Sequence, residues 1–119
     1  MLNWNKELWL IDHGASFYFH HSWNNWEKHA NGTFPLIKDH VMLERASELE
    51  QASQEIKSKL TPEMIDQIVD LVPNDFLIEE GNEITPMEKR KVYSTFIKTK
   101  IYNLDLLTKE ANDVRKRSL

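Results

Sequence analysis

The chain has 119 residues, the size of one ordinary domain, and we expect residues 1–119 to form a single unit. Its formal charge of −4 excludes a general attraction to nucleic acid or to anionic membranes, so neither is expected as a partner. The absence of Cys excludes a disulfide framework, thiol catalysis and Cys-based zinc sites, and no apolar run reaches the roughly 20 residues that span a bilayer. Because the N-terminus lacks a signal-peptide pattern, we expect a cytoplasmic location.

Two short apolar runs, Leu2–Trp4 and residues 8–11, open the chain. Asn5-Lys6 between them can form a tight turn, because Asn tolerates a positive φ, and the pattern predicts a β-hairpin. Gly14 then allows the chain to leave the strand. The aromatic stretch at 17–26 predicts one or two helical turns.

From residue 39 onward the pattern predicts helices. Apolar residues recur every three or four positions over residues 39–60, with charges between them. Thr61-Pro62 predicts the start of a second helix, and a capping box at residues 85–88 predicts the start of a third. The apolar stripes of these helices are taken as core: Met42, Ala46, Leu49, Ala52, Ile56 and Leu60; then Met64, Ile65, Ile68, Val69 and Val72; then Val92, Tyr93, Phe96, Ile97, Ile101 and Leu104. The fold class is therefore mainly α, a β-hairpin followed by three or more helices.

Asp12 is the candidate site residue. It follows an apolar strand and precedes Gly14 by two positions, so its carboxylate is expected at a strand end. A hard oxygen ligand on a rigid element suits a divalent cation. The alternative is that Asp12 only starts a turn through its side-chain oxygen.

Residues 10–21, Leu-Ile-Asp-His-Gly-Ala-Ser-Phe-Tyr-Phe-His-His, resemble the metal-binding segment of HipA-like kinases, in a compact bacterial branch of that family. The resemblance continues through residues 34–41, 60–63 and 71–75, and so covers nearly the whole chain. It implies that the helices form the C-terminal lobe of a protein-kinase-like fold. It also implies that Asp12 is the magnesium ligand, with His13 at the Phe position of the Asp-Phe-Gly motif.

The resemblance also shows what the chain lacks. A phosphotransferase of this family needs a nucleotide-binding lobe with a phosphate-contacting Lys, a base Asp and a second metal-binding Asn. In the family these elements precede the hairpin, and the Asn would fall just before Met1. We therefore assign no catalytic residue, expect the magnesium and ATP of the parent family not to be bound by this chain alone, and expect essentially no turnover. The expected partner is the missing N-terminal kinase part, or a second copy of the chain bound through the aromatic hairpin.

Two other interpretations of the chain's function stay open. The chain can be a non-catalytic interaction module, with the hairpin as its contact surface. It can also be a metal-binding protein, because imidazole is the commonest transition-metal ligand and five histidines fall within 28 residues, although their spacing matches no familiar pattern: His13, His20, His21, His29 and His40. The acid pair Glu79-Glu80 is expected to lie in a solvated loop.

Overall fold

The computed structural model describes residues 2–118. It is mainly helical with an N-terminal antiparallel hairpin, as the sequence predicts. The strands are β1 (Leu2–Trp4) and β2 (Glu7–Trp9). The helices, in chain order, are η1 (His13–His21), α1 (Trp26–Asn31), η2 (Pro35–Asp39), η3 (Leu43–Arg45), α2 (Leu49–Lys59), α3 (Pro62–Asp70), η4 (Asn74–Phe76), α4 (Pro86–Tyr102) and α5 (Leu104–Ser118), where η marks 3-10 helices.

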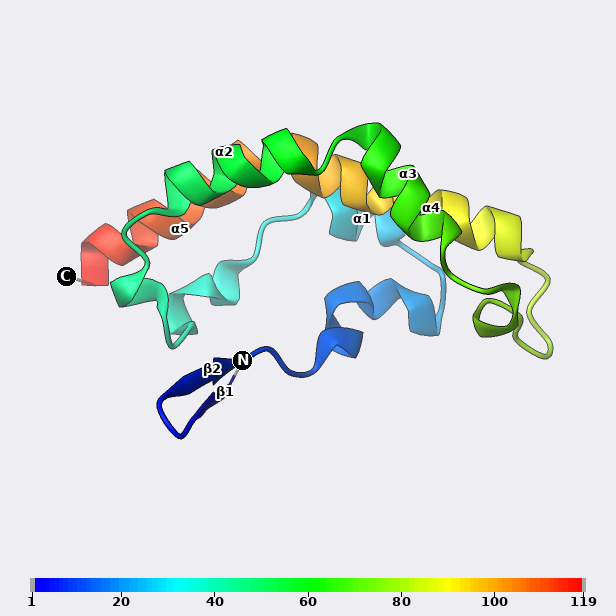
Figure 1. Ribbon diagram of the computed structural model, residues 1–119, viewed down its shortest axis with the longest axis horizontal. Helices are drawn as coiled ribbons and strands as arrows, with labels where there is room; N and C mark the ends of the chain where they lie inside the picture. The colour runs from blue at the N-terminus through cyan, green and yellow to red at the C-terminus, as the bar shows by residue number, and fades with distance from the viewer. Residues whose placement is uncertain (1, 119) are drawn as a thin grey trace.

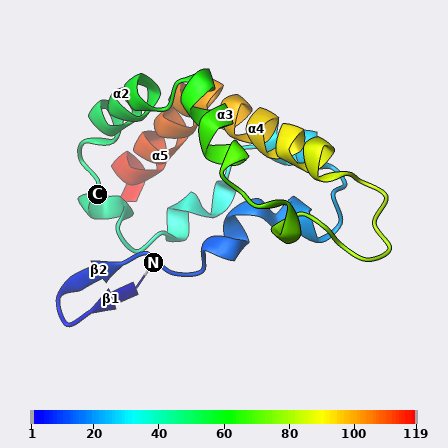
Figure 2. The same cartoon turned by 45° about the vertical axis from the view of Figure 1, so that its right-hand side comes forward.

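The helices form an arc rather than a ball (Figure 1). Helix α4 packs against α1 and α3, and α5 packs against α2, η2 and η3. The hairpin projects from the lower side of the arc in both ribbon views (Figures 1 and 2). The radius of gyration is 16.3 Å, with a longest extent of 49 Å. Within the described residues, no helix combines the length and apolarity that crossing a bilayer requires.

The hairpin forms where the sequence predicts it. Asn5 and Lys6 both take left-handed backbone conformations, with φ of 50° and 66°, as a two-residue primed turn requires. Strand β2 ends at Trp9, so the apolar Leu10 and Ile11 lie beyond it. All six strand residues are exposed, which leaves the hairpin without a cover.

The core lies where η1 and α1 meet α4. Phe19, Ala30 and Phe96 are buried together. The rings of Phe19 and Phe96 have centroids 4.8 Å apart, and Phe17 meets Phe96 edge-on at 5.7 Å. Burying one such ring contributes about 1.5–3 kcal/mol, and each well-oriented aromatic pair adds about 0.5–1.5 kcal/mol. The aromatic N-terminal segment is therefore held by the long helix α4.

The predicted helix starts are confirmed for α3 and α4. The Met64 backbone N–H donates to Oγ1 of Thr61 at 3.2 Å. At α4 both halves of the capping box are present: the Glu88 N–H donates to Oγ1 of Thr85 at 3.2 Å, and the Thr85 N–H donates to the Glu88 carboxylate at 2.8 Å. Two donors that would otherwise lack partners are satisfied at that helix end.

The single helix predicted over residues 39–60 is wrong in its first half, because α2 begins only at Leu49. Local hydrogen bonds turn the backbone before that point. The Met42 N–H donates to Nδ1 of His40 at 3.2 Å, and the Ser47 N–H donates to the Arg45 carbonyl at 3.0 Å. Side-chain acceptors of this kind compete with the helical pattern. The last predicted stripe is likewise divided into α4 and α5 at Asn103.

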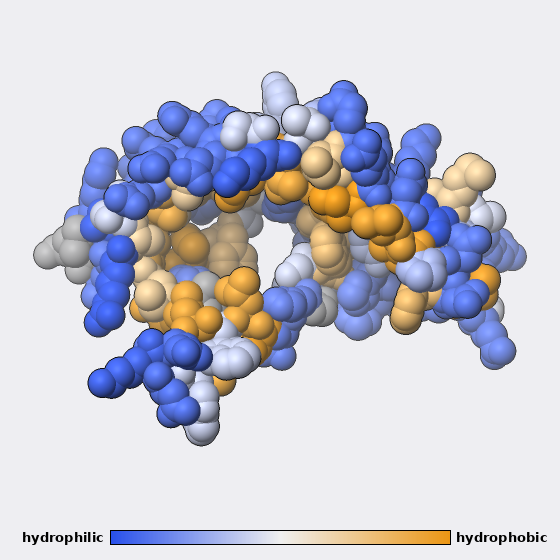
Figure 3. Space-filling model, viewed as in Figure 1, coloured by the Kyte–Doolittle hydropathy of each residue, from blue (hydrophilic) through white to orange (hydrophobic). Residues whose placement is uncertain are grey.

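The apolar stripes are only partly core. In α3, Ile65 and Val69 are buried, whereas Met64 and Ile68 are 43% and 47% exposed. Ile56 on α2 is exposed as well. Figure 3 shows hydrophobic residues gathered along the inner side of the arc, around its hollow, with polar residues on the outer rim. Much of the apolar pattern therefore faces a space that the chain does not fill.

Candidate functional site

Asp12 lies in the link between β2 and η1, three residues beyond the end of the strand. Its backbone is left-handed, with φ 59° and ψ 43°, a conformation that Asp visits more readily than most residues. It occupies the position before the first turn of η1, but its side chain makes no capping hydrogen bond there. The alternative role of Asp12, in which its side-chain oxygen starts the turn, is therefore not accompanied by a capping hydrogen bond.

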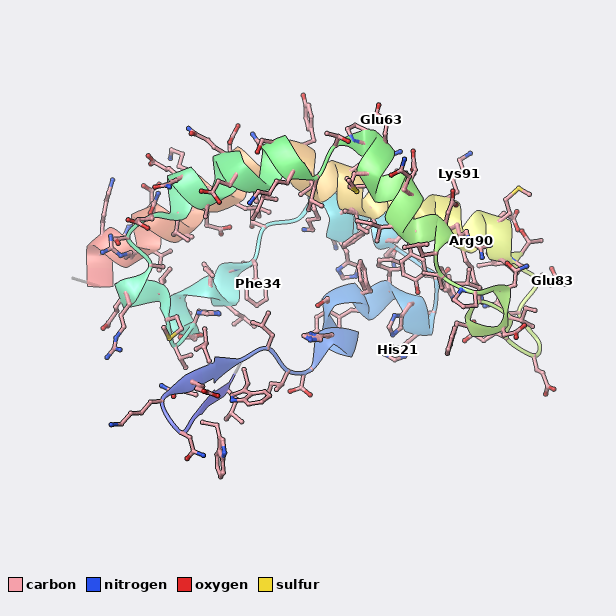
Figure 4. The ribbon with its side chains drawn as sticks, in the orientation of Figure 1. His21, Phe34, Glu63, Glu83, Arg90 and Lys91 are labelled. Carbon is pink, nitrogen blue, oxygen red and sulfur yellow. The ribbon has the colours of Figure 1, made fainter. Side chains whose placement is uncertain are left out.

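The Asp12 carboxylate is exposed, and it makes no hydrogen bond or ion pair with the rest of residues 2–118. It borders a cavity of about 480 Å³. Three parts of the chain line this cavity: η1 with the link before it, the segment from α1 to η2, and the helices α4 and α5. Phe34, at the start of η2, projects into the hollow of the arc (Figure 4). The lining residues are Asp12, Ser16, Tyr18, Phe19, His29, Thr33, Phe34, Phe96, Lys100 and Leu107.

Lys100 supplies the cation of this cavity. Its ammonium donates to the Gly32 carbonyl at 2.8 Å and lies 5.8 Å from the centroid of the Phe96 ring. Partial burial lowers the pKa of Lys100, because the charged form loses hydration. The cavity therefore combines a carboxylate, an ammonium, an imidazole and hydroxyl groups, and such a lining suits a small polar ligand.

Asp12 supplies a single carboxylate to the lining of this cavity and is not part of a closed metal cage. In the described residues, no three His, Asp or Glu side chains come together as a metal-binding group. Mg²⁺ in phosphoryl-transfer sites is commonly held by one or two carboxylates together with substrate phosphates. The exposed carboxylate of Asp12 is a ligand of the chemical type that such sites use.

The five histidines are distributed over several elements. His13 begins η1, and His20 and His21 end it, with their rings edge-on at 4.5 Å. His29 borders the Asp12 cavity, and His40 accepts the Met42 N–H. The sequence did not predict that His29 and Asp12 border the same cavity, because their common position depends on how α1 packs on α4.

A second polar cluster was missed from the sequence. Lys89 on α4 has a side chain only 2% exposed, and its ammonium lies 2.7 Å from the Glu79 carboxylate. The same ammonium lies 4.9 Å above the Trp23 ring. The Trp23 indole N–H and the Asn82 amide also donate to Glu79, at 3.2 and 3.0 Å. The cluster ties the N-terminal aromatic segment to the loop before α4.

The prediction of a solvated loop is correct for both acids, since Glu79 and Glu80 are exposed and lie outside the helices, but it did not foresee that Glu79 pairs with Lys89. The hydrogen bond from Lys89 lowers the pKa of Glu79, and those from Asn82 and Trp23 lower it further. No sequence spacing predicts the hydrogen bond between Trp23 and Glu79, since the two residues are 56 positions apart. A lysine at a position of α4 that faces the core is the one signal that pattern reasoning could have used.

No family model, curated protein or solved structure matches the chain.

Proposed function

We propose that this chain forms the helical, metal-carboxylate part of a HipA-like phosphotransferase, with Asp12 as one ligand of the magnesium ion that accompanies ATP. The observation that carries the proposal is the free carboxylate of Asp12, exposed just beyond a hairpin and beside a polar cavity. Support also comes from the resemblance of residues 10–21 to the metal-binding segment of that family.

Asp12, Lys100 and the rings of Phe19 and Phe96 have different roles in the proposed site. In such enzymes magnesium bridges phosphate oxygens and neutralises charge that develops during transfer. Asp12 offers the ion a hard oxygen and is not engaged elsewhere in the described chain. Lys100 holds α4 to the Gly32 carbonyl and places one positive charge on the cavity wall. The apolar wall formed by Phe19 and Phe96 limits access of water from the core side.

The chain is not proposed to supply all the groups that phosphate transfer requires. Its three glycines are isolated, so no Gly-rich phosphate loop is encoded, and the resemblance assigns no base Asp or second metal-binding Asn to these residues. Turnover then requires a nucleotide-binding unit that completes the site. The chain alone is expected neither to hydrolyse ATP nor to phosphorylate itself.

The test supplies the completing unit as a separate polypeptide, the nucleotide-binding part of a HipA-like kinase, together with Mg²⁺ and radiolabelled ATP. The mixture should transfer phosphate where neither part does so alone. Asp12→Asn should lower the rate by about 10²–10³, the size of effect seen when one preorganised electrostatic group is removed. Asp75→Asn, at an exposed acid on η4, is the matched control and should leave the rate unchanged.

A second experiment uses this chain alone, so it does not depend on phosphate transfer in the two-component mixture. Paramagnetic Mn²⁺ with ATP should broaden the amide signals around Asp12, and Asp12→Asn should abolish the broadening while Asp75→Asn leaves it intact. Broadening that survives Asp12→Asn, or turnover that is equal in both variants, would remove Asp12 from the proposal.

A second candidate, a non-catalytic interaction module, is favoured by the uncovered hairpin. Trp4 and Trp9 are 61% and 52% exposed, far more than is usual for large aromatic side chains. Large exposed apolar patches of this kind commonly mark sites of interaction with another protein. Both candidates require a partner, and they differ in whether Asp12 contributes to what the assembly does.

A further inference from the structure

The chain exposes more surface than its mass predicts. Its accessible surface is 9336 Å². A compact protein of 14.1 kDa would expose about 6,700 Å², so the excess is about 2,600 Å². The radius of gyration of 16.3 Å likewise exceeds the roughly 13.5 Å expected for a domain of this length. A stable interface takes about 800 Å² from each partner, and the excess is about three times that area.

The hairpin contributes an exposed aromatic face to this surface. In the register, Leu2 is paired with Trp9, and Trp4 is paired with Glu7. Directly paired residues of antiparallel strands share one face, so these four side chains lie together while Asn3 and Leu8 occupy the other face. We call the first set the hairpin face. Glu7 is its single ionisable group.

A second exposed apolar surface is a groove where η1, α3, η4 and α4 meet. Its volume is about 360 Å³, within the range of pockets that hold small organic groups, so it can accept an indole ring. Every residue that lines it is apolar or aromatic, including Phe17, Ile68, Val72, Phe76, Tyr93 and Ile97. Phe76, at 81% exposure, stands at its rim.

The hairpin face and the groove are separated within one molecule. In Figures 1 and 2 the hairpin lies at one end of the lower side and the segment around η4 lies toward the other. A charge match accompanies the apolar match. Arg90, labelled in Figure 4, donates to the carbonyl of Val72, a residue of the groove, and so places a guanidinium near it. The hairpin face carries the acid Glu7.

We propose that a second copy of this chain covers these surfaces, in a twofold dimer in which each hairpin face enters the apolar groove of the partner. A reciprocal exchange buries both surfaces of both copies at once and closes the assembly, whereas a one-way contact would leave a groove free and continue into polymers. The same molecule supplies both halves of the contact, an exposed aromatic face and an apolar groove. The inference requires neither a metal nor phosphoryl transfer.

Sedimentation velocity between 1 and 100 µM tests the assembly. The unsubstituted chain should be dimeric over the upper part of this range. Trp4→Glu, on the hairpin face, and Phe76→Glu, at the groove, should each be monomeric and fully folded by circular dichroism, because both side chains are exposed within one chain. Val41→Glu, at a 78% exposed residue outside both surfaces, is the control and should remain dimeric.

Mixing the two monomeric variants tests the reciprocal arrangement. The Trp4→Glu chain keeps an intact groove and the Phe76→Glu chain keeps an intact hairpin, so an equimolar mixture should recover association, more weakly than the unsubstituted chain. A dimer that survives Phe76→Glu but not Trp4→Glu means that hairpins pair with each other, and it overturns the groove contact. A monomer at every concentration, or a mixture with no association, overturns the proposal.

Discussion

The hairpin and the aromatic cluster on α4 are built from similar residues and end in opposite environments. Trp4 and Trp9 project from a two-stranded sheet with nothing over them. Phe19 and Trp23, further along the chain, pack against Tyr93 and Phe96. Aromatic content therefore does not decide burial in this chain. The decisive factor is whether another element presents a matching face.

Helix α4 presents such a face because it is long and firmly started. It runs for 17 residues from a capping box, and its core side carries the residues on which η1, α1 and α3 pack. The hairpin strands have three residues each, and a two-stranded sheet of this size is marginal in water without cover. The stability of the chain should accordingly be concentrated around α4.

The largest effect should come from emptying the aromatic cluster. Phe19 is 2% exposed, and Phe19→Ala should cost about 3–5 kcal/mol of unfolding free energy because it leaves a cavity among packed rings. Trp4→Ala removes a larger ring from the hairpin and should cost less than about 0.5 kcal/mol in dilute solution. Urea unfolding followed by circular dichroism measures both. Equal losses would contradict the contrast between the two regions.

The next effect should come from Lys89, which holds the cluster to the loop before α4. Lys89→Ala removes three buried methylenes, worth about 2 kcal/mol at roughly 0.8 kcal/mol each, and leaves Glu79 without its ammonium partner. Lys91→Ala, two positions along the same helix and exposed, is the matched control and should change little. The urea midpoints of the two variants measure the difference. If they coincide, Lys89 does not contribute to the stability of the fold.

The cap of α4 should matter by a smaller amount. Thr85→Ala removes the side chain that accepts the Glu88 N–H and should cost about 1 kcal/mol. Thr85→Ser keeps the hydroxyl and should retain most of the stability. Thermal unfolding of the two variants separates the cap from mere side-chain size, and a loss shared by both would indicate size.

The smallest effect is a pH dependence. Because the pKa of Glu79 is lowered in the folded chain, its contribution to stability is complete above the ordinary Glu value of about 4.3. That contribution is lost as the pH falls from there through the lower folded value. The stability difference between the parent chain and Glu79→Gln should thus shrink below about pH 4.3. Trp fluorescence during unfolding at pH 6 and pH 3 measures it, with exposed Glu80→Gln as a control that should show no such change.

Local signals in the sequence predicted the hairpin and the helix starts correctly. Asn5-Lys6 formed the turn, and Thr61 and Thr85 formed the caps, because each depends on residues at most three positions apart. The first half of the helix predicted over 39–60 failed for a local reason that periodicity does not report, the side-chain hydrogen bond at His40. Apolar spacing alone could not show that the backbone turns there.

Of the residues that border the candidate cavity, the sequence singled out Asp12 as a metal ligand, and that role stays a prediction. Its position after a hairpin followed from the apolar runs, whereas the cavity beside it depends on how His29 of α1 and Lys100 of α4 are brought together by packing. The apolar stripes correctly identified helices but not what they face. Ile68 and Met64 have core-like spacing, yet they lie open because no described part of the chain covers them.

Hydrogen exchange of the hairpin and of α4, compared at low and high protein concentration, tests most directly the claim that the hairpin has no cover within one chain. At 1 µM, the amides of residues 2–9 should exchange with little protection, while those in the centre of α4 exchange slowly. At 100 µM, hairpin protection should rise at least tenfold in the parent chain and stay unchanged in Trp4→Glu. Hairpin amides as protected as those of α4 at 1 µM would contradict the account.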